Sequence, residues 1–570
     1  MPLASTSDVN AIEAPVTWKA YLMCAFASFG GIFFGYDSGY INGVVASRQF
    51  INAIQGTQAK EISSSRTSLI VSILSAGTFF GALIAGELAD RVGRRPTIIA
   101  GCGLYMAGVV IQMFAATGLA TIVMGRLVAG FGVGFVSAII ILYMSEICPR
   151  KIRGTLVSGY QVRGCSFQGI GLMIASIINN FTKNRPDSGS YRIPIAIQLA
   201  CKSPLFEERG LILGTGLFFL PDSPRYYVKK GQPEKARAVL VRLRGQPTGS
   251  EFIEVELAEI VANAEIEARA IPTGSWFASW RACFSGSVFR SSSNLRRTIL
   301  GTSLQMMQQW TGVNFIFYFS TPFLQSTGAI SDSFLISMIF TIVNVVSTPI
   351  SFYTVEKFGR RPLLIWGACG MMICQFLVAI IGVTVGFNKT YVNAAGETLA
   401  RNISAVNAQV AFIAIFIFFF ASTWGPGAWV LIGEIFPLPI RSRGVALSTA
   451  SNWLWNTIIA VITPYLVNPD RANLRSSVFF LWGGLCSCAF LYAYLFIPET
   501  KGLSLEQVDL MFSETTPRKS SRWRPTHTFA AEKDHDPYSH DGIGEPGGPG
   551  GLDVDGKAKF GGEIAHRDIA

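Results

Sequence analysis

The chain has 570 residues, half of them hydrophobic and only 15% charged, with 42 Phe and a mean hydropathy of +0.39. This excess of apolar residues argues against a soluble domain and is typical of a protein that crosses a membrane many times. The formal charge of +11 does not indicate a nucleic-acid partner, because the basic residues stand in short clusters between apolar runs, as they do in cytoplasmic loops.

Apolar segments of about 20 residues, the length that crosses a bilayer as a helix, occur twelve times. They cover approximately 19–36, 67–86, 97–116, 119–143, 155–178 and 193–220, and then 297–320, 333–354, 363–386, 407–433, 445–467 and 478–497. The pattern predicts an all-α membrane protein made of an N-terminal six-helix bundle (19–220), a charged central loop (221–296) and a C-terminal six-helix bundle (297–497). We expect amphipathic helices at about 233–244 and 251–268, a cytoplasmic N-terminus (1–18) and a largely disordered tail (498–570).

Two features predict the side of the membrane on which each loop lies. Four basic clusters lie on the same side of the membrane as the central loop: Arg91/Arg94/Arg95, Arg150/Lys151/Arg153, Lys357/Arg360/Arg361 and Arg441/Arg443. Basic residues are enriched in cytoplasmic loops, so this side, with the central loop and both termini, is predicted to be cytoplasmic. The Asn-x-Ser/Thr sequons at Asn180, Asn388 and Asn402 all fall in loops predicted to lie outside, where glycosylation can occur.

The stretch Gln305 to Asn314 opens the seventh span with Gln305, Gln308, Gln309 and Asn314. Amides are costly in hydrocarbon unless they face protein or water. Because amides both donate and accept hydrogen bonds, this cluster matches a hydroxyl-rich ligand such as a sugar. The alternative is contact between helices, since Gln and Asn also bond across membrane helices.

The two halves of the chain repeat each other in sequence. Gly93-Arg-Arg-Pro96 matches Gly359-Arg-Arg-Pro362, and Glu146 to Arg153 matches Glu434 to Arg441 in register. Pro221-Asp-Ser-Pro-Arg225 similarly echoes Pro498-Glu-Thr-Lys501. Two six-helix halves related in this way imply a central pathway at their interface, with the ligand near the middle of the bilayer.

The ordered set of motifs resembles the sugar porter family of the major facilitator superfamily over about residues 20–510. The matching residues also include Gly35-Tyr-Asp37, Gly125-Arg126 and Gln308-Gln309-x-x-Gly-x-Asn314. The segment Asn184 to Pro194 is similar to fungal hexose transporters in particular. No Walker loop, nucleophile with a base or metal-ligand spacing occurs in the sequence, so we expect neither enzymatic activity nor a metal or other cofactor.

The resemblance places the sugar contacts on amide and aromatic side chains of both halves: Gln161, Gln308, Gln309, Asn314, Asn344, Trp429, Asn452 and Trp453, with Phe34 and Tyr318 lining the same pocket. Physical chemistry agrees, because amides bond to hydroxyl groups and indoles stack on the C–H face of a sugar. For any single amide, a structural contact between helices is the alternative.

Asp37 and Arg126 are the candidates for proton coupling. Asp37 lies about eighteen residues into an outward-running helix, and Arg126 lies about seven residues into an inward-running one, roughly 10 Å below the outer boundary. Pairing would offset the cost of burying the carboxylate. In symporters of the family the matching aspartate takes the proton, so the resemblance implies that protonation of Asp37 releases Arg126. A fixed structural pair is the alternative.

Charged residues at the predicted cytoplasmic helix ends are candidates for a gate that holds the halves together: Asp90, Arg94, Arg95, Glu146, Arg153, Arg360, Arg361, Glu434 and Arg441. Carboxylate–guanidinium pairs there would separate when the inside opens. Solvated basic residues of a cytoplasmic loop would explain single arginines, but they explain the in-register Glu/Arg repeat poorly.

Two segments depart from the family pattern. Residues 201–210 place Lys202, Glu207, Glu208 and Arg209 in the middle of the sixth span, at a cost on the order of 10 kcal/mol. A translated intron, an error in the gene model or a loop at the outer surface would each explain this segment, and residues 162–168 raise a similar question after Gln161.

The prediction is therefore a multi-pass plasma-membrane protein that transports glucose-like hexoses as a monomer by alternating access, coupled to protons. Gly30-Gly31-x-x-x-Gly35 resembles a pattern linked to pentose acceptance, which adds xylose as a candidate. The alternatives are a facilitative uniporter and a transporter-like sugar sensor. A tail of about 70 residues without an evident repeated motif favours transport.

Overall fold

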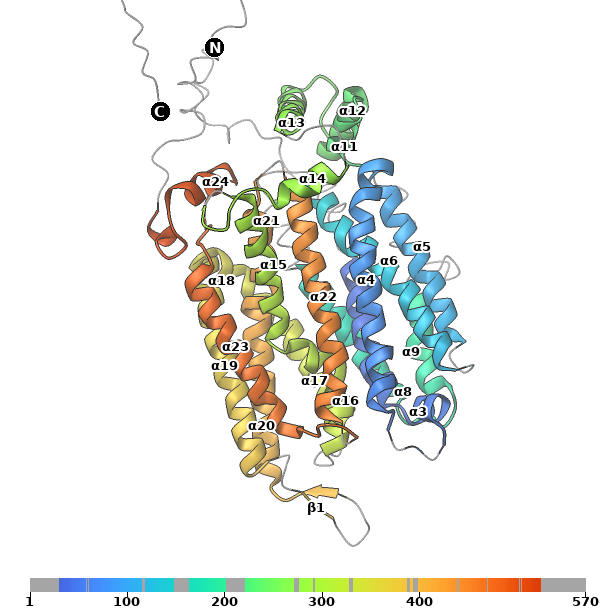
Figure 1. Cartoon of the computed structure of the whole chain (residues 1–570). Helices are drawn as coiled ribbons and strands as arrows, with labels where there is room; N and C mark the ends of the chain where they lie inside the picture. Colours follow the sequence, from blue (N-terminus) through green and yellow to red (C-terminus); the bar gives the residue numbers. More distant parts are fainter. Residues whose placement is uncertain are drawn as a thin grey trace, which may run out of the picture. The chain divides into compact units, whose positions relative to one another are not determined.

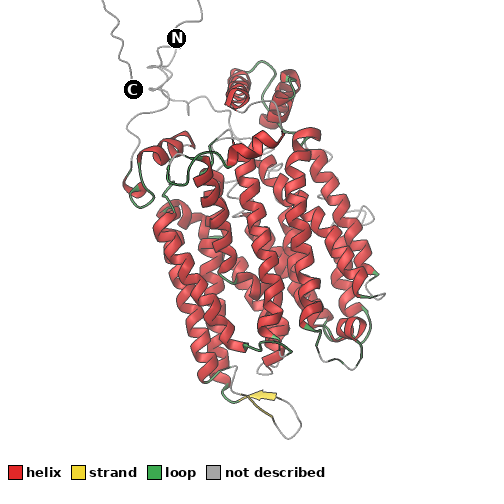
Figure 2. Cartoon of the chain, viewed as in Figure 1, coloured by secondary structure: helices red, strands yellow, loops and turns green. Residues whose placement is uncertain are grey.

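The computed structural model describes residues 30–57, 59, 61–114, 118–147, 163–200, 221–270, 276–290, 293–327, 332–386, 390–392, 398–437, 440–468, 470–501, 503 and 505–523. The chain divides into a compact unit, Met1–Arg524, and a second unit, Pro525–Ala570, and only the first contains described residues. The regular structure described is helical apart from one two-stranded hairpin (Figure 2).

The described helices of the N-terminal half are α2 (Gly30–Ala46), α3 (Arg48–Gln55), α4 (Ser64–Val92), α5 (Arg94–Met113), α6 (Leu119–Ile147), α8 (Arg163–Thr182) and α9 (Gly189–Ala200) (Figure 1). Glycines bring α4 and α6 together closely. A Cβ atom on Gly77 would lie 2.6 Å from the carbonyl oxygen of Leu127, and one on Gly134 would lie 2.5 Å from that of Thr78. Small residues of this kind allow backbones to pack where lipid provides no hydrophobic drive between helices.

The C-terminal half contains α15 (Asn294–Trp310), α16 (Val313–Thr327), α17 (Ser333–Ser347), α18 (Ile350–Phe358), α19 (Arg360–Thr384), α20 (Ile403–Phe419), the π-helix η2 (Phe420–Trp424), α21 (Gly425–Glu434), α22 (Arg441–Val467), the 3-10 helix η4 (Arg475–Ser477) and α23 (Val478–Phe496). Strands β1 (Thr390–Val392) and β2 (Thr398–Ala400) pair antiparallel between α19 and α20.

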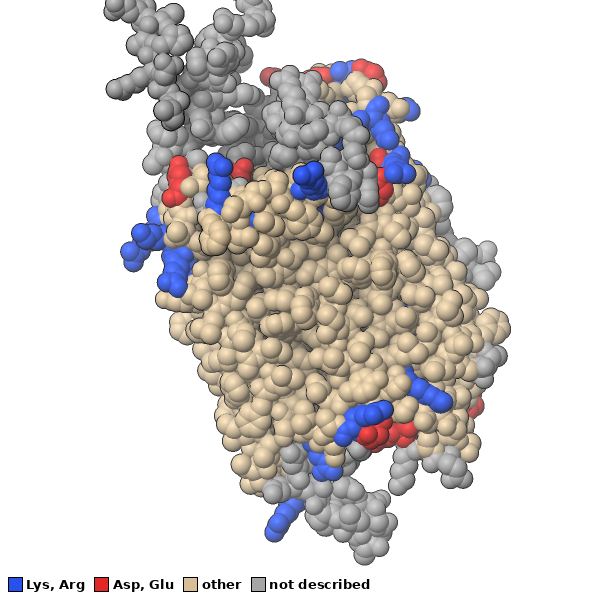
Figure 3. Space-filling model, viewed as in Figure 1, with Lys and Arg blue, Asp and Glu red and all other residues tan. Residues whose placement is uncertain are grey.

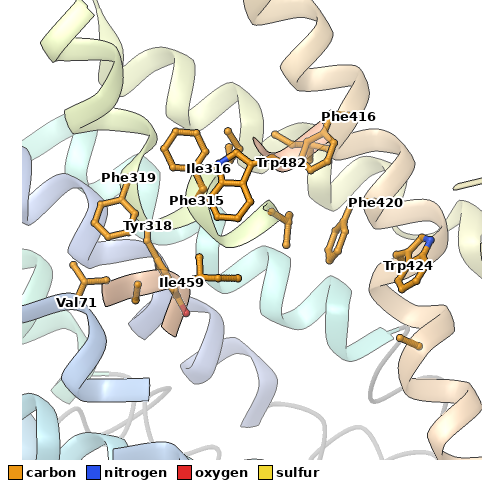
Figure 4. Packing of buried hydrophobic residues seen from close by; sticks show 14 of the residues in the cluster. Val71, Phe315, Ile316, Tyr318, Phe319, Phe416, Phe420, Trp424, Ile459 and Trp482 are labelled. Atoms are coloured by element: carbon orange, nitrogen blue, oxygen red, sulfur yellow. The ribbon is translucent and has the colours of Figure 1, made fainter. Parts of the chain in front are cut away.

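The predicted seventh span is broken between α15 and α16. Gly312 has φ +80°, and a Cβ atom there would lie 2.8 Å from the indole of Trp482. Trp482 stacks on Phe315 at 6.1 Å between ring centroids, and both belong to the buried apolar cluster of this half (Figure 4). The break therefore turns the chain against an aromatic core, directly beside the polar stretch Gln305 to Asn314.

The composition of the surface fits a membrane protein. Seven helical segments of the described chain are long and apolar enough to cross a bilayer, and Gly169–Thr182 and Ser333–Ser347 are shorter apolar helices. Figure 3 shows a wide band without charged residues between two ends that carry them. We call the end beside α11 to α14 the central-loop end and the opposite end, beside β1, the hairpin end (top and bottom of Figure 1).

Each of the twelve predicted spans overlaps a helix, and the predicted fold class is confirmed, but the bounds of the first span were wrong. We expected it to end at residue 36, whereas α2 continues to Ala46. Asp37, Ser38 and Asn42 are buried, so these polar residues face protein within the helix and do not mark its end. Residues 201–210 and Gln161 lie outside the described part, while Arg163–Gln168 form the first turns of α8.

The amphipathic helices expected in the central loop are present as α12 (Pro233–Arg244) and α13 (Glu251–Ala270), flanked by α11 (Pro224–Lys229) and α14 (Trp276–Cys283). Part of the predicted tail is helical, because α24 (Leu505–Glu514) and the 3-10 helix η5 (Ser520–Arg522) follow the last span, while residues 524–570 lie outside the described part. Val508, Met511 and Phe512 are buried, so one apolar face of α24 packs on the bundle and orders the segment.

Candidate functional site

Five amide side chains from α15, α16 and α22 form one connected network. Asn452 donates to Gln305 Oε1 at 2.7 Å and to Gln308 Oε1 at 2.9 Å, and it accepts from Gln309 Nε2 at 2.9 Å. Asn314 donates in turn to Gln309 Oε1. We call these five residues the amide cluster. All of them are buried except Asn314, which is half-buried.

Gln308 ties the amide cluster to a distorted helix. Its Nε2 donates to the carbonyl oxygens of Trp424 at 2.8 Å and Gly425 at 3.0 Å, at the junction of η2 and α21. The indole of Trp424 donates to the Leu364 carbonyl at 2.8 Å, so this junction is also held to α19. Both Nε2 hydrogens of Gln308 are therefore used within the protein, and in this conformation the residue acts as a contact between helices.

The other predicted sugar contacts differ in how far their side chains are already buried or hydrogen-bonded within the protein. The side chain of Asn344 takes part in no hydrogen bond between described residues, and Trp429 is half-buried. Trp453 is buried, and Tyr318 accepts from Asn456 Nδ2 at 3.2 Å. Asn314, Asn344 and Trp429 thus retain the most capacity to contact a ligand. Phe34 belongs to α2, but its side chain lies outside the described residues, as does all of Gln161.

Asp37 lies in a buried polar group on the N-terminal half. Its Oδ1 lies 3.5 Å from the Tyr105 hydroxyl, which donates to Gln198 Oε1 at 2.7 Å. Arg126 Nη1 donates to the Tyr40 hydroxyl at 2.7 Å, and that hydroxyl donates to Gln112 Oε1 at 2.5 Å. The Tyr40 hydroxyl therefore occupies Nη1 of Arg126, and the direct pair of Arg126 with Asp37 remains a prediction.

Asp37 and Arg126 lie at similar distances from the ends of their helices. Nine residues of α2 follow Asp37, about 13 Å at 1.5 Å per residue, and Arg126 lies about 10 Å into α6. Both side chains are almost fully buried. The sequence did not mark Tyr40, Tyr105, Gln112 and Gln198 as site residues, because tyrosines and glutamines in apolar helices also occur as ordinary core residues.

At the central-loop end, Arg94 forms a buried bidentate pair with Glu146, with Nε to Oε2 and Nη2 to Oε1 both at 3.0 Å. Arg94 also lies 3.3 Å from Asp90. Asp222 accepts from the backbone N–H groups of Arg94 at 3.1 Å and Ser223 at 2.8 Å, and it thereby caps α5. The net effect is a raised pKa for Asp222, because burial of the carboxyl outweighs the N–H groups, which favour its ionised form.

The C-terminal half repeats this geometry. Arg360 pairs with Glu434 at 3.2 Å (Nε to Oε2) and 2.7 Å (Nη2 to Oε1). Glu499 accepts from the backbone N–H groups of Arg360 at 3.0 Å and Arg361 at 3.2 Å, in the role that Asp222 has in the first half. Thr500 also donates to Glu434 at 2.6 Å. The repeated motifs of the sequence therefore build two equivalent charge clusters.

Each of these clusters joins elements of a single half, so the predicted clamp between the halves remains a prediction. Arg441 donates to the Gly433 carbonyl at 2.6 Å, and Arg361 donates to the Tyr494 carbonyl at 2.9 Å. The Arg95 N–H lies 3.5 Å from Asp222 Oδ1, and Arg153 lies outside the described residues. The motifs that contain Asp222 and Glu499 are visible in the sequence, but nothing in them predicted that these two carboxylates cap helices.

Between described residues, polar contacts join the two halves from the middle of the bundle to the hairpin end. Asn42 on α2 donates to Ser320 at 2.9 Å and accepts from the Thr321 N–H at 3.0 Å, both on α16. The Ser64 N–H at the start of α4 donates to Asp470 Oδ2 at 3.1 Å, and Ser75 donates to Asn456 at 3.2 Å. The halves are therefore held together along this side of their interface.

An ion pair adds to these contacts. Lys183, just after α8, lies 2.5 Å from Asp332, which also accepts from the Leu335 N–H at 3.1 Å and caps α17. Burial works against ionisation of Asp332, but the Lys183 ammonium and the N–H groups of Leu335 and Phe334 outweigh it and lower the pKa of this carboxyl.

Two of the sequon residues are described. Asn402 is exposed, and its side-chain oxygen caps α20 by accepting from the Ala405 N–H at 3.1 Å, which leaves Nδ2 available for a glycan. Asn180 is half-buried in the last turn of α8, and Asn388 lies outside the described residues. In the part of the chain that the structure describes, no group of three His, Cys, Asp or Glu residues is placed to hold a metal ion.

Comparison with known proteins gives consistent results. The family model for sugar (and other) transporters matches residues 23–512. The chain is 42% identical to a major facilitator-type transporter of Aspergillus rugulosus over 91% of its own length and 92% of that protein. It is 38% identical to a probable glucose transporter of Neurospora crassa, covering 90% and 83% of the two chains. The structure of the proton:xylose symporter XylE bound to 6-bromo-6-deoxy-D-glucose superposes with a TM-score of 0.68 at 23% identity, over 87% of this chain and 100% of that one.

Proposed function

This chain belongs to the sugar (and other) transporter family, and we propose that it carries glucose-like hexoses across the plasma membrane by alternating access. The observation that carries this proposal is the amide cluster on the break between α15 and α16. Its half-buried member Asn314, together with Asn344 and Trp429, offers hydrogen bonds and an aromatic face, the two kinds of contact that a monosaccharide needs.

The polar contacts between the halves support the conformational part of the proposal. Among the described residues, those contacts are concentrated toward the hairpin end, while the charge clusters at the central-loop end join residues of the same half. With the central loop in the cytoplasm, as the basic clusters predict, this is a conformation closed toward the outside. Opening the outer side requires the Asn42, Ser64 and Lys183 contacts to break, while each half moves as a unit.

Proton coupling through Asp37 is the finer part of the proposal. Asp37 and Arg126 are buried at similar depth, and Tyr40 lies between the arginine and Gln112. Protonation of Asp37 would remove the negative charge that the buried guanidinium balances, which would free Arg126 and Tyr40 to rearrange. The test is an Asp37→Asn variant: uptake down a gradient should continue, while accumulation against a gradient and its sensitivity to a protonophore should both be lost. An Asp37→Asn variant that still accumulates sugar would exclude this role.

The transport proposal itself is tested in a yeast strain that lacks hexose transporters. Expression of a cDNA-verified chain should restore uptake of labelled glucose, and xylose in a parallel arm tests pentose acceptance. A protonophore arm separates symport from facilitated diffusion. Good surface expression with no uptake of any monosaccharide would contradict transport and favour the sugar-sensor alternative.

A further inference from the structure

The segment 505–523, which we call the tail strap, folds back on the C-terminal half. Val508, Met511 and Phe512 of α24 are buried in the main apolar cluster. Arg297, in the first turn of α15, forms an ion pair with Asp509, and its guanidinium lies 4.6 Å from the centroid of the Phe512 ring. The tail strap is therefore attached to the same helix that carries the amide cluster.

A second attachment lies at Ser520, near the end of the tail strap. The Ser520 hydroxyl accepts from the Glu499 N–H at 2.8 Å and donates to the Pro517 carbonyl at 2.6 Å, and the residue is only 3% exposed. The carboxylate of Glu499 caps α19 through Arg360 and Arg361. Ser520 thus holds the residue that closes the C-terminal charge cluster.

The residues around Ser520 are basic and exposed. The sequence reads Arg518-Lys519-Ser520-Ser521-Arg522, and every member except Ser520 is exposed. Protein kinases with acidic substrate grooves bind serines flanked by arginine and lysine through charge complementarity. We propose that Ser520 is a phosphorylation site and that its modification releases the tail strap from the C-terminal half. The proposal uses the predicted cytoplasmic position of the tail, where nucleoside triphosphate is available.

The chemistry is phosphoryl transfer from ATP held by the kinase. The Ser520 oxygen forms a bond to the γ-phosphorus as the bond from that phosphorus to the bridging oxygen breaks, ADP leaves, and the hydroxyl proton passes to a carboxylate of the kinase. The kinase acts on molecules in which the end of the tail strap has opened locally, as terminal segments do. Ser520 lies after α24, so its end of the tail strap can open locally while the Arg297–Asp509 pair is still formed.

The phosphoserine cannot return to the docked position. The docked Ser520 oxygen lies 2.8 Å from the backbone of Glu499, an acidic residue, in a site with almost no exposed surface. A phosphate adds about two negative charges and three oxygen atoms, which this site cannot solvate and which the Glu499 carboxylate repels. Release therefore becomes permanent until the phosphate is removed, and it separates the start of α15 from its contacts with α24.

The test uses the purified full chain in detergent, a protein kinase that prefers basic substrates, and ATP. Phosphosite mapping by mass spectrometry should place phosphate on Ser520, and hydrogen exchange of peptides within 505–523 should become about tenfold faster or more. A Ser520→Glu variant should reproduce the faster exchange. Ser521→Glu, with the same charge added at the exposed neighbour, should keep the protection of the wild type, as should Ser520→Thr.

Unchanged exchange of α19 peptides in each variant shows that the bundle is still folded. Phosphate found only on Ser521, no phosphate on either serine, or a Ser520→Glu variant with the protection of the wild type would each overturn the proposal.

Discussion

Replacing Asn452 by Leu tests whether the amide cluster organises the sugar site. Asn452 is 4% exposed and makes three side-chain hydrogen bonds, two as donor and one as acceptor. Leucine has a similar size but no polar atom, so the change removes these bonds without leaving a large cavity. Gln305 Oε1 and Gln309 Nε2 lose the partners described above, while Gln308 keeps its bonds to Trp424 and Gly425.

The expected cost follows from these three bonds. Hydrogen bonds between membrane helices contribute about 0.6 kcal/mol each on average, which gives about 2 kcal/mol for the set. Leaving buried amides without partners raises the figure, since each such group costs about 1 to 3 kcal/mol. We therefore expect Asn452→Leu to lose about 2 to 4 kcal/mol of stability. Because Gln309 also orients Asn314, the apparent KM for glucose should rise about tenfold or more, equivalent to about 1.4 kcal/mol.

The assays are denaturant unfolding of the purified protein and initial rates of labelled glucose uptake. Gln409→Leu is the matched control, because Gln409 is a fully buried amide on α20 that donates to the Val378 carbonyl at 2.8 Å, outside the amide cluster. It should lose about 1 kcal/mol of stability and keep the KM of the wild type. An Asn452→Leu transporter with an unchanged KM would refute a sugar site built on the amide cluster.

Two further predictions concern the caps and the hairpin end. Gly359→Ala should destabilise the protein by about 1 to 3 kcal/mol, because φ is +90° and the new Cβ would lie 2.4 Å from Glu499 Oε2. Gly433→Ala, whose Cβ meets open space, is its control, and equal thermal stability of the two variants would contradict the strain argument. The lowered pKa of Asp332 means that its contribution to stability is present above the ordinary value of 3.8 and is lost as the pH falls through the lowered pKa. Thermal melts of Asp332→Asn should therefore depend less on pH below about 4 than those of the wild type, and identical pH profiles would contradict the Lys183 pairing.

Sequence patterns predicted the architecture well because they report on burial along whole helices. Spans of about 20 apolar residues, the repeated motifs and the polar stretch at Gln305 are each visible without knowing any contact. The in-register repeat of Glu146 and Glu434 marked these residues as equivalent, but it did not predict that each would pair with an arginine of its own half, Arg94 and Arg360.

Contacts that depend on the approach of distant segments could not be predicted in the same way. The sequence marks Asp37 and Arg126 as costly to bury, but it does not say that Tyr40, one turn away on α2, occupies Nη1 of the arginine. The sequence likewise predicts Gln308 as a sugar contact. In the structure, the side chain of Gln308 instead donates to two carbonyl oxygens at the junction of η2 and α21. Distortions of this kind arise from packing between helices, so they cannot be predicted from the hydropathy of single residues.

The location of the two capping carboxylates has a consequence for biosynthesis. Asp222 lies at the start of the central loop, so every residue of its cluster with Arg94 and Glu146 has left the ribosome before the second half of the chain is complete. The first six-helix bundle can therefore lock its central-loop end while the second is still untranslated. The equivalent cluster of the second bundle includes Glu499, which follows its last span, so this cluster closes only when almost the whole chain has been made.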